Sequence, residues 1–197
     1  MTAAVRLEDV TGEAIAGVLE PLAALRLAVF REYPYLYDGD AAYEARYLAS
    51  YGASPSGLVV IAWDGDRVVG ASTGLPLWQH SDEVVPPLAA AGFDPDQVFY
   101  FGESVLDPAY RGRGLGHGFF DHREAHARAA GYRYATFCAV DRPADHPRRP
   151  ADYVPHDAFW TKRGYVRKPD ITARFAWRDL DEAAETDKPM TFWIKEL

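Results

Sequence analysis

A glycine-rich turn between a predicted strand and a predicted helix constrains the fold of this chain more than any other feature. The apolar run Val98 to Leu106 predicts a buried strand, and a helical pattern extends from about Leu115 to Ala130, where Gly131 ends it. The apolar run Tyr134 to Val140 then predicts another strand. A strand, a helix and a strand in succession predict a parallel pair joined by a right-handed crossover.

Further strands and helices are expected on both sides of this unit. The expected strands are Val5 to Asp9, Gly57 to Trp63, Arg67 to Leu75, Ile171 to Trp177 and Met190 to Lys195, with an acidic loop from Asp179 to Asp187 between the last two. The expected helices are the segment from Thr11 to Val29, which Pro21 kinks or divides, a segment capped by Asp38 or Asp40 that runs through Ser50, and Asp157 to Arg163.

The chain has no repeat and no long linker, so it is expected to form a single α/β domain over residues 1–197. Prolines and glycines in residues 81 to 97 predict an irregular insertion with at most one short helix. Because the flanking strands form hairpins around one parallel pair, the sheet is expected to be mixed.

The charge of the chain is unevenly distributed. The net charge is -8, which argues against nonspecific binding of nucleic acid because phosphate neutralisation needs a basic face. Residues 107 to 168 nevertheless carry 12 basic and 7 acidic side chains, whereas the rest of the chain carries 9 basic and 22 acidic ones. This basic segment predicts an anionic ligand, and chance clustering on a solvated surface is the alternative.

The sequence predicts a protein of the cytoplasm. The longest apolar runs, such as Gly57 to Trp63, fall well short of the roughly 20 residues that cross a bilayer, so no membrane span is expected. Acidic residues near the N-terminus argue against a secretory signal peptide. Cys138 is the only cysteine, which excludes an intrachain disulfide and a multi-cysteine metal site. His122 and His126 have the i, i+4 spacing of metal ligands but lack an evident third ligand, so no metal is expected.

The glycine-rich turn has the properties of a phosphate-binding site. Backbone N–H groups and the helix dipole point at one spot ahead of the predicted helix, and this arrangement suits a pyrophosphate. Gly114 and Gly116 lack the Cβ that would keep a phosphate away, while Arg111 and Arg113 add positive charge. A dinucleotide fingerprint fits only loosely, and His117 breaks the pattern of a Walker loop. A helix start that binds nothing is the alternative.

The stretch from Val105 to Gly116 resembles the signature Q/R-x-x-G-x-G/A of the GNAT superfamily of N-acetyltransferases, and Asp157 to Tyr165 is similar to the short fourth helix of that family. The resemblance implies a GNAT-like fold, with a mixed, mostly antiparallel sheet of six to seven strands flanked by about four helices. It also implies acetyl-CoA as acetyl donor and makes a homodimer plausible. The cofactor-binding residues that it implies are Ser104, Val105, Leu106, Arg111, Gly112, Arg113, Gly114, Leu115, Gly116, His117 and Trp160.

The same resemblance implies that Glu103 is the general base. It lies beside the expected thioester, where acidic residues of relatives accept the proton of the amine directly or through water. Strict alternation places Glu103 on the face opposite Gly102, and a bulge near Ser104 would change that; a Glu103 that only forms a salt bridge or orients the acceptor is the alternative. Many relatives have an acidic Tyr where this chain has Trp160, so the general acid stays open among Tyr153, His156, Tyr165 and unassisted departure of the thiolate.

The acceptor is expected to be a primary amine of a small molecule or a peptide. Tyr33, Tyr35 and Tyr37 follow the first predicted helix, in a region that borders the acceptor in this family, and they could bind a cationic amine together with Asp38. A packed surface loop is the alternative for this segment. For the whole chain, the alternative to an N-acetyltransferase is a noncatalytic acyl-CoA-binding or sensing domain.

Overall fold

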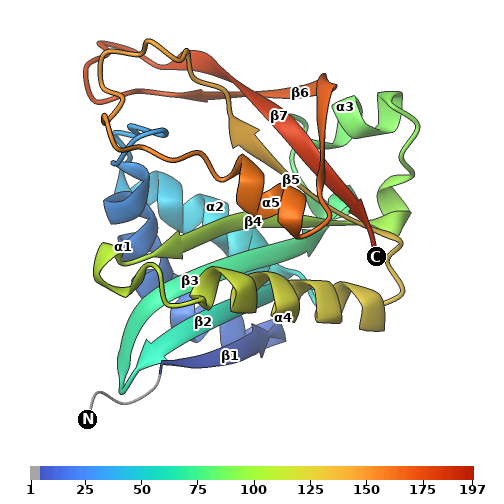
Figure 1. The fold of residues 1–197 in the computed structure, drawn as a ribbon. Coiled ribbons are helices and arrows are strands. Elements are labelled where there is room, and N and C mark those ends of the chain that lie inside the picture. The colour runs from blue at the N-terminus through green and yellow to red at the C-terminus, as the bar shows by residue number, and fades with distance from the viewer. Residues whose placement is uncertain (1–4) are drawn as a thin grey trace.

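The computed structural model describes residues 5–197 and contains a sheet of seven strands in the order β1-β2-β3-β4-β5-β7-β6 (Figure 1). The strands are β1 (Arg6–Thr11), β2 (Leu58–Asp64), β3 (Arg67–Pro76), β4 (Val98–Leu106), β5 (Tyr134–Val140), β6 (Val166–Trp177) and β7 (Thr186–Glu196). All neighbouring strands are antiparallel except β4 and β5, which are parallel. The prediction of a mixed, mostly antiparallel α/β sheet is confirmed.

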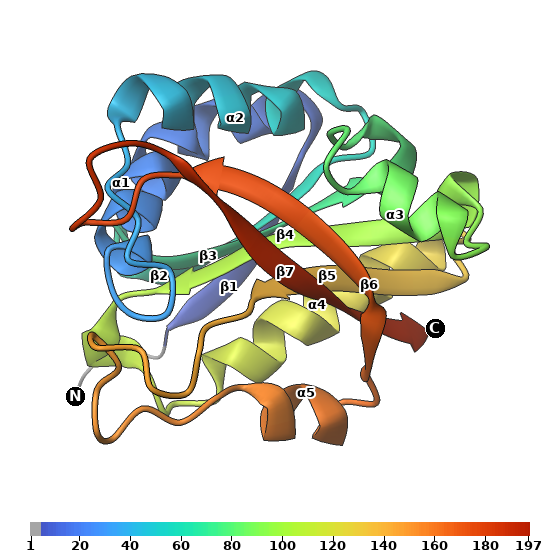
Figure 2. The same cartoon turned by 90° about the horizontal axis from the view of Figure 1, so that it is seen from above.

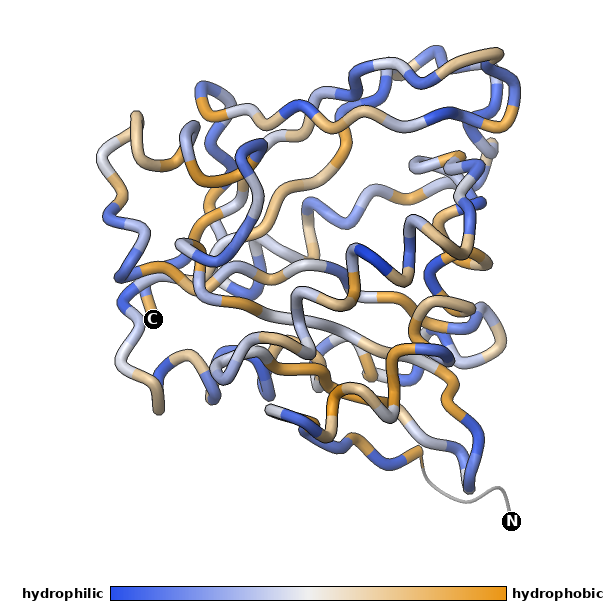
Figure 3. Tube along the Cα trace, turned by 180° about the vertical axis from the view of Figure 1, so that it is seen from behind, coloured by the Kyte–Doolittle hydropathy of each residue, from blue (hydrophilic) through white to orange (hydrophobic). Residues whose placement is uncertain are grey.

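The helices cover both faces of the sheet (Figure 2). Within the described residues they are α1 (Leu19–Phe30), α2 (Ala41–Ala53), α3 (Val85–Ala90), α4 (Leu115–Ala129) and α5 (Asp157–Lys162), five where about four were expected. Helices α1 and α2 bury one face, and α4 and α5 bury the other. Figure 3 shows hydrophobic stretches along the strands in the middle of the molecule and mostly hydrophilic outer turns. No helix in residues 5–197 has both the length and the apolarity to cross a membrane.

Local sequence signals place most elements correctly. Asp40 caps α2, since its Oδ1 accepts the N–H groups of Ala42 and Tyr43 at 2.9 Å each. Pro21 lies in the first turn of α1, where its missing N–H is tolerated, and a 3-10 helix over Gly12–Val18 precedes it. The insertion over residues 81–97 contains only α3 and a 3-10 turn, as predicted.

The last two strands are longer than predicted. Strand β6 begins at Val166 instead of Ile171, and β7 begins at Thr186, inside the expected acidic loop. The extra residues are mostly polar, and each set pairs with the predicted part of the other strand: Val166 to Lys168 with Phe192 to Ile194, and Thr186 to Pro189 with Arg174 to Trp177. A register shift between Lys168 and Thr172 interrupts the pairing. Such long-range pairing leaves no apolar alternation in either segment, so the local pattern does not reveal it.

The parallel pair β4–β5 opens partway along its length. Strand β4 pairs with β5 only from Val98 to Tyr100, and beyond that point β4 continues beside β3 while β5 continues beside β7. The sheet therefore has a gap in its hydrogen bonding that begins at Phe101. This gap positions the site described below.

A buried arginine in the loop after β5 joins three distant segments. Both terminal nitrogens of Arg142 bind Asp179, at 2.7 and 2.9 Å, and its remaining donors bind the carbonyl oxygens of Pro34 and Tyr35, each at 2.7 Å. Only 9% of the Arg142 side chain is exposed. The guanidinium therefore connects the α1–α2 loop to the segment between β6 and β7.

We expect Arg142→Ala to lower the free energy of unfolding by about 3 kcal/mol, because it leaves Asp179 buried with weaker partners and removes the donor to the carbonyl oxygen of Pro34, whereas that of Tyr35 still accepts from Trp177 Nε1. Urea denaturation measures the change. Arg148→Ala is the control, since Arg148 is an exposed arginine of the same loop whose contact with Asp181 is 3.7 Å long. Equal losses in the two variants would contradict the role of Arg142.

Candidate active site

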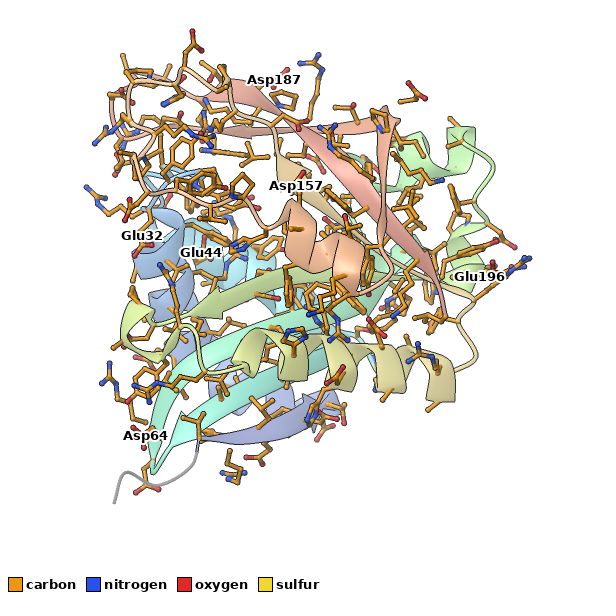
Figure 4. The ribbon with its side chains drawn as sticks, viewed as in Figure 1. Glu32, Glu44, Asp64, Asp157, Asp187 and Glu196 are labelled. Carbon is orange, nitrogen blue, oxygen red and sulfur yellow. The ribbon has the colours of Figure 1, made fainter. Side chains whose placement is uncertain are left out.

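A cleft of about 1270 Å³ opens where β4 and β5 part. Its walls come from the C-terminal half of β4, the glycine-rich turn, the loop after α1, the end of β5 and helix α5. Figure 4 shows two of its carboxylates, Asp157 at the start of α5 and Glu32 beyond the end of α1. The strands thus hold the floor of the cleft, and loops form most of its rim.

The glycine-rich turn forms one end of the cleft. Gly112 and Gly114 have φ angles of 74° and 83°, and a Cβ at either position would meet no atom within 4 Å, so these glycines are required by the backbone and leave open space in front of it. Gly114 is the N-cap of α4, and the first N–H groups of that helix lack intrahelical acceptors. The turn therefore fits a pyrophosphate, with Arg111 beside it in the cleft wall.

Some of the predicted cofactor-binding residues line the cleft, and others do not. Those that line the cleft are Ser104, Leu106, Arg111, Gly112, Gly114, Gly116, His117 and Trp160. The side chain of Val105 is fully buried in the core below α1 and α2. Arg113 lies over the ring of Tyr110 and donates to the carbonyl oxygen of Ala109, and Leu115 is the first residue of α4. The side chains of Val105, Arg113 and Leu115 thus do not line the cleft.

A β-bulge turns Glu103 toward helices α1 and α2. Ser72 pairs with Ser104 and Gly74 pairs with Phe101, so Gly102 and Glu103 together lie opposite Thr73. A Cβ on Gly102 would lie 2.2 Å from the hydroxyl of Tyr51 on α2, which shows that this position faces the same side as Glu103. The expectation from strict alternation, that the two residues face opposite sides, is wrong because the bulge inserts a residue.

The carboxylate of Glu103 is held on one oxygen only. Its Oε2 forms an ion pair with Arg26 Nη1 at 2.6 Å and accepts a hydrogen bond from the Tyr47 hydroxyl at 3.3 Å, while Oε1 is buried without a partner among the described residues. Burial raises the pKa of Glu103 above that of an ordinary glutamate, although Arg26 acts in the opposite direction. A glutamate with a raised pKa and a free oxygen is suited to accept a proton near neutral pH.

Arg26 belongs to two ion pairs at once. It binds Glu44 on α2 as well as Glu103 on β4, and only 8% of its side chain is exposed. Burial opposes the charge of Arg26, but Glu103, Tyr47 and Glu44 together raise its pKa. Sequence reasoning missed this residue. The available signal was a charged side chain on the apolar stripe of α1, four residues after Leu22.

The candidate acids have different surroundings. Trp160 packs against Phe137 and Trp193, with ring centroids 5.0 and 5.2 Å apart, and forms part of the cleft wall. The Tyr165 hydroxyl is buried and donates to Glu124 at 3.1 Å, so it is not directed into the cleft. Tyr153 and His156 both line the cleft.

The three tyrosines that were predicted to bind the acceptor lie in two different pockets. Tyr33 and Tyr35 line the cleft, and the Tyr33 ring lies 4.7 Å from that of Tyr153 on the opposite loop. Tyr37 instead lines a separate pocket of about 330 Å³ with Tyr43. The chain changes direction between them at Leu36, whose φ angle is 53°, a value that local pattern does not predict for a leucine.

Known proteins share both sequence and fold features with this chain. Residues 22–151 match the Acetyltransferase (GNAT) family. No curated protein sequence matches the chain. Its fold is similar to that of yncA from Salmonella typhimurium with its cofactor acetyl-CoA, with a TM-score of 0.59 and 13% identity over 99% of this chain and 95% of that one.

Two further solved structures have folds similar to that of this chain. The ribosomal-protein-alanine N-acetyltransferase of Brucella melitensis has a TM-score of 0.62 and 13% identity, over 98% of this chain and 99% of that one. The polyamine N-acetyltransferase of Drosophila melanogaster has a TM-score of 0.59 and 14% identity, over 98% of this chain and 100% of that one. The three structures show the common fold, and the sequence match covers most of the chain. The chain therefore belongs to the GNAT acetyltransferase family and is an acyltransferase.

Proposed function

We propose that this protein transfers an acetyl group from acetyl-CoA directly to a primary amine of a small molecule or a peptide, and that the chain acts as one acetyltransferase domain. The observation that carries the proposal is that Glu103, whose Oε1 has no partner among the described residues, lines the same cleft as the glycine-rich turn. The cleft thus combines a candidate base with a phosphate-binding turn. Transfer to an amine needs both.

Acetyl-CoA would lie along the opening between β4 and β5. The amides of residues 111–116 bind its pyrophosphate, and the main-chain groups of Ser104 to Leu106 pair with its pantetheine arm. His117 and Trp160 line the wall beside it. When bound, acetyl-CoA supplies the acetyl group as a thioester, and backbone N–H groups of β4 stabilise the charge that develops on the carbonyl oxygen.

Glu103 removes the proton that keeps the acceptor amine from acting as a nucleophile. An ammonium group must lose a proton before it can attack, and Oε1 accepts that proton directly or through one water. Arg26 and Tyr47 bind Oε2 and fix the orientation of the carboxylate. No covalent intermediate on the protein is required.

The acceptor end of the cleft favours a cation. Tyr33 and Tyr35 offer aromatic rings, to which a cationic amine is attracted. Asp152 and Asp157 line the same cleft, and neither forms an ion pair within residues 5–197. The relatives named above from Brucella and Drosophila act on a ribosomal-protein alanine and on polyamines, which supports an amine as acceptor.

Calorimetric titration of the purified protein with acetyl-CoA tests the proposal, with CoA and NAD as comparison ligands. We expect saturable micromolar binding of acetyl-CoA and no binding of NAD, followed by thiol release when cationic amines are added. Absence of acetyl-CoA binding would contradict the assignment of the cleft. Binding without thiol release for any amine would instead support an acyl-CoA-binding domain.

A further inference from the structure

A buried arginine without a carboxylate partner lies under the cleft. Arg123 on α4 is 2% exposed and lines the cleft. Its hydrogen bonds within the described residues go to neutral acceptors, which are the carbonyl oxygens of Phe119, Thr73 and Glu103 and the hydroxyl oxygen of Ser104. Burial lowers the pKa of Arg123 to about 10, so the group remains a cation at neutral pH. These acceptors and the rings of Phe101 and Phe120, 4.3 and 4.9 Å from its Cζ, stabilise the charge, and no carboxylate of the described residues forms an ion pair with it.

The contact between Arg123 and Ser104 orients the serine hydroxyl. Arg123 Nη2 donates to Ser104 Oγ at 2.8 Å, and arginine has no acceptor atom, so the hydroxyl proton of Ser104 cannot point back at it. Ser104 is the exposed residue of β4 beyond the bulge, and it lines the cleft. Its O–H is therefore free to donate to an atom in the cleft.

We propose that the Ser104 hydroxyl, held by Arg123, donates a hydrogen bond to the sulfur of CoA as the thiolate leaves. This inference rests on the proposed binding of acetyl-CoA in the cleft. Ser104 is the catalytic residue in this step, because it touches the reacting atoms. Arg123 is a positioning residue, and its charge strengthens the donor.

The step balances without a protein acid. The amine nitrogen forms a bond to the carbonyl carbon, the bond from that carbon to sulfur breaks, and its electron pair moves to the sulfur. Glu103 takes one proton from the ammonium before attack, and the nitrogen loses a second proton to water as the amide forms. Ser104 keeps its own proton, because an alcohol is a far weaker acid than a thiol, and the released thiolate takes a proton from solvent.

Of the other candidate donors, Tyr153 and His156 line the cleft from the loop that precedes α5, and two more belong to the wall or to the core. Trp160 packs among aromatic rings, and the Tyr165 hydroxyl donates to Glu124. Arg123 is in direct contact with Ser104, and Glu103 precedes Ser104 on β4 and faces α1 and α2. Arg123 also lies over the rings of Phe101 and Phe120 and donates to three carbonyl oxygens, so its charge is fixed in place beside Ser104.

The ultraviolet absorbance of the CoA thiolate provides a test that does not depend on turnover. CoA bound to the protein is titrated with base, and the complex with desulfo-CoA supplies the protein background. Cys138, the only cysteine, does not interfere, because burial raises the pKa of its thiol to about 12. We expect the pKa of the bound CoA thiol to lie below that of free CoA.

Four variants distinguish an effect of the Ser104 hydroxyl from a general loss of structure. Ser104→Ala is expected to raise the pKa of the bound thiol by about one to two units and to lower kcat about ten- to hundred-fold, with little change in the KM for acetyl-CoA. Ser104→Thr keeps the hydroxyl and is expected to restore the thiol pKa and kcat. Arg123→Met should raise the thiol pKa as well. Ser72→Ala is the matched control, because Ser72 pairs with Ser104 across β3 and β4 but does not line the cleft, and it should leave the thiol pKa unchanged.

The outcomes distinguish this inference from the proposed function. An unchanged thiol pKa in Ser104→Ala would overturn the inference, even if Arg123→Met fails to fold. An equal rise in Ser72→Ala would also overturn it. If CoA does not bind the wild-type protein at all, both the proposed function and this inference fail.

Discussion

Replacing Glu103 by glutamine is expected to lower kcat by about 10²- to 10⁴-fold, which is the usual contribution of a positioned general base. The amide keeps the shape of the side chain and can still accept from Arg26, but it cannot take a proton. The affinity for acetyl-CoA should stay unchanged, because Glu103 faces α1 and α2 and the phosphate-binding turn lies at another part of the cleft. Steady-state kinetics and calorimetry measure the two quantities.

The pH profile gives the same prediction a second readout. Glu103 works only when it is deprotonated, so the wild-type rate should fall as the pH drops through its pKa, which is raised by burial. In Glu103→Gln the inflection at the pKa of Glu103 disappears, and the rate should depend on pH only through the deprotonation of the amine in solution, which continues to higher pH. Glu44→Gln is the control, since it changes the other carboxylate on Arg26 and leaves the base in place, so the inflection should persist, moved to lower pH because Glu44 helps to raise the pKa of Glu103. An unchanged rate in Glu103→Gln for all amines would remove Glu103 from the mechanism.

Replacing Gly114 by valine is expected to weaken acetyl-CoA binding about ten- to hundred-fold. At a φ angle of 83° a β-branched residue is strained by about 1 to 3 kcal/mol, and relief of that strain moves the turn that holds the pyrophosphate. The added side chain also enters the open space in front of the backbone. Calorimetric titration with acetyl-CoA measures the loss.

The other end of the same helix supplies a matched control. Gly131 has a φ angle of 84° and ends α4 far from the cleft, so Gly131→Val introduces the same strain without touching the turn. It should lower the stability of the protein and leave the acetyl-CoA affinity intact. Intact binding in Gly114→Val would show that the turn does not hold the cofactor.

Local patterns predicted the elements that depend on local forces. The bounds of β4 and β5 agree with the apolar runs, and Asp40 caps α2 through its own side chain. The glycines of the turn were recognisable because positive φ angles at Gly112 and Gly114 admit few other residues. The family signature follows from the same turn, so the fold class and the family could be predicted.

The chemistry inside the cleft depends on contacts between distant segments. Arg26 meets Glu103, 77 positions along the chain, only because α1 packs on β4. The bulge that turns Glu103 toward α1 and α2 arises from the pairing of β4 with β3. Pairing register and buried ion pairs are set by the whole core, and alternation within one strand does not contain them.

The sequence by itself thus determined the family, the order of most elements, the phosphate-binding turn and the candidate base. Only the tertiary structure decided that Tyr37 lies outside the cleft and that, within residues 5–197, Glu103 has one oxygen without a partner and Arg123 is buried beside Ser104 without a carboxylate. The physical reason is that helix caps, glycine turns and apolar periodicity are short-range properties. Burial, pKa values and hydrogen-bond partners arise when the sheet brings distant residues together.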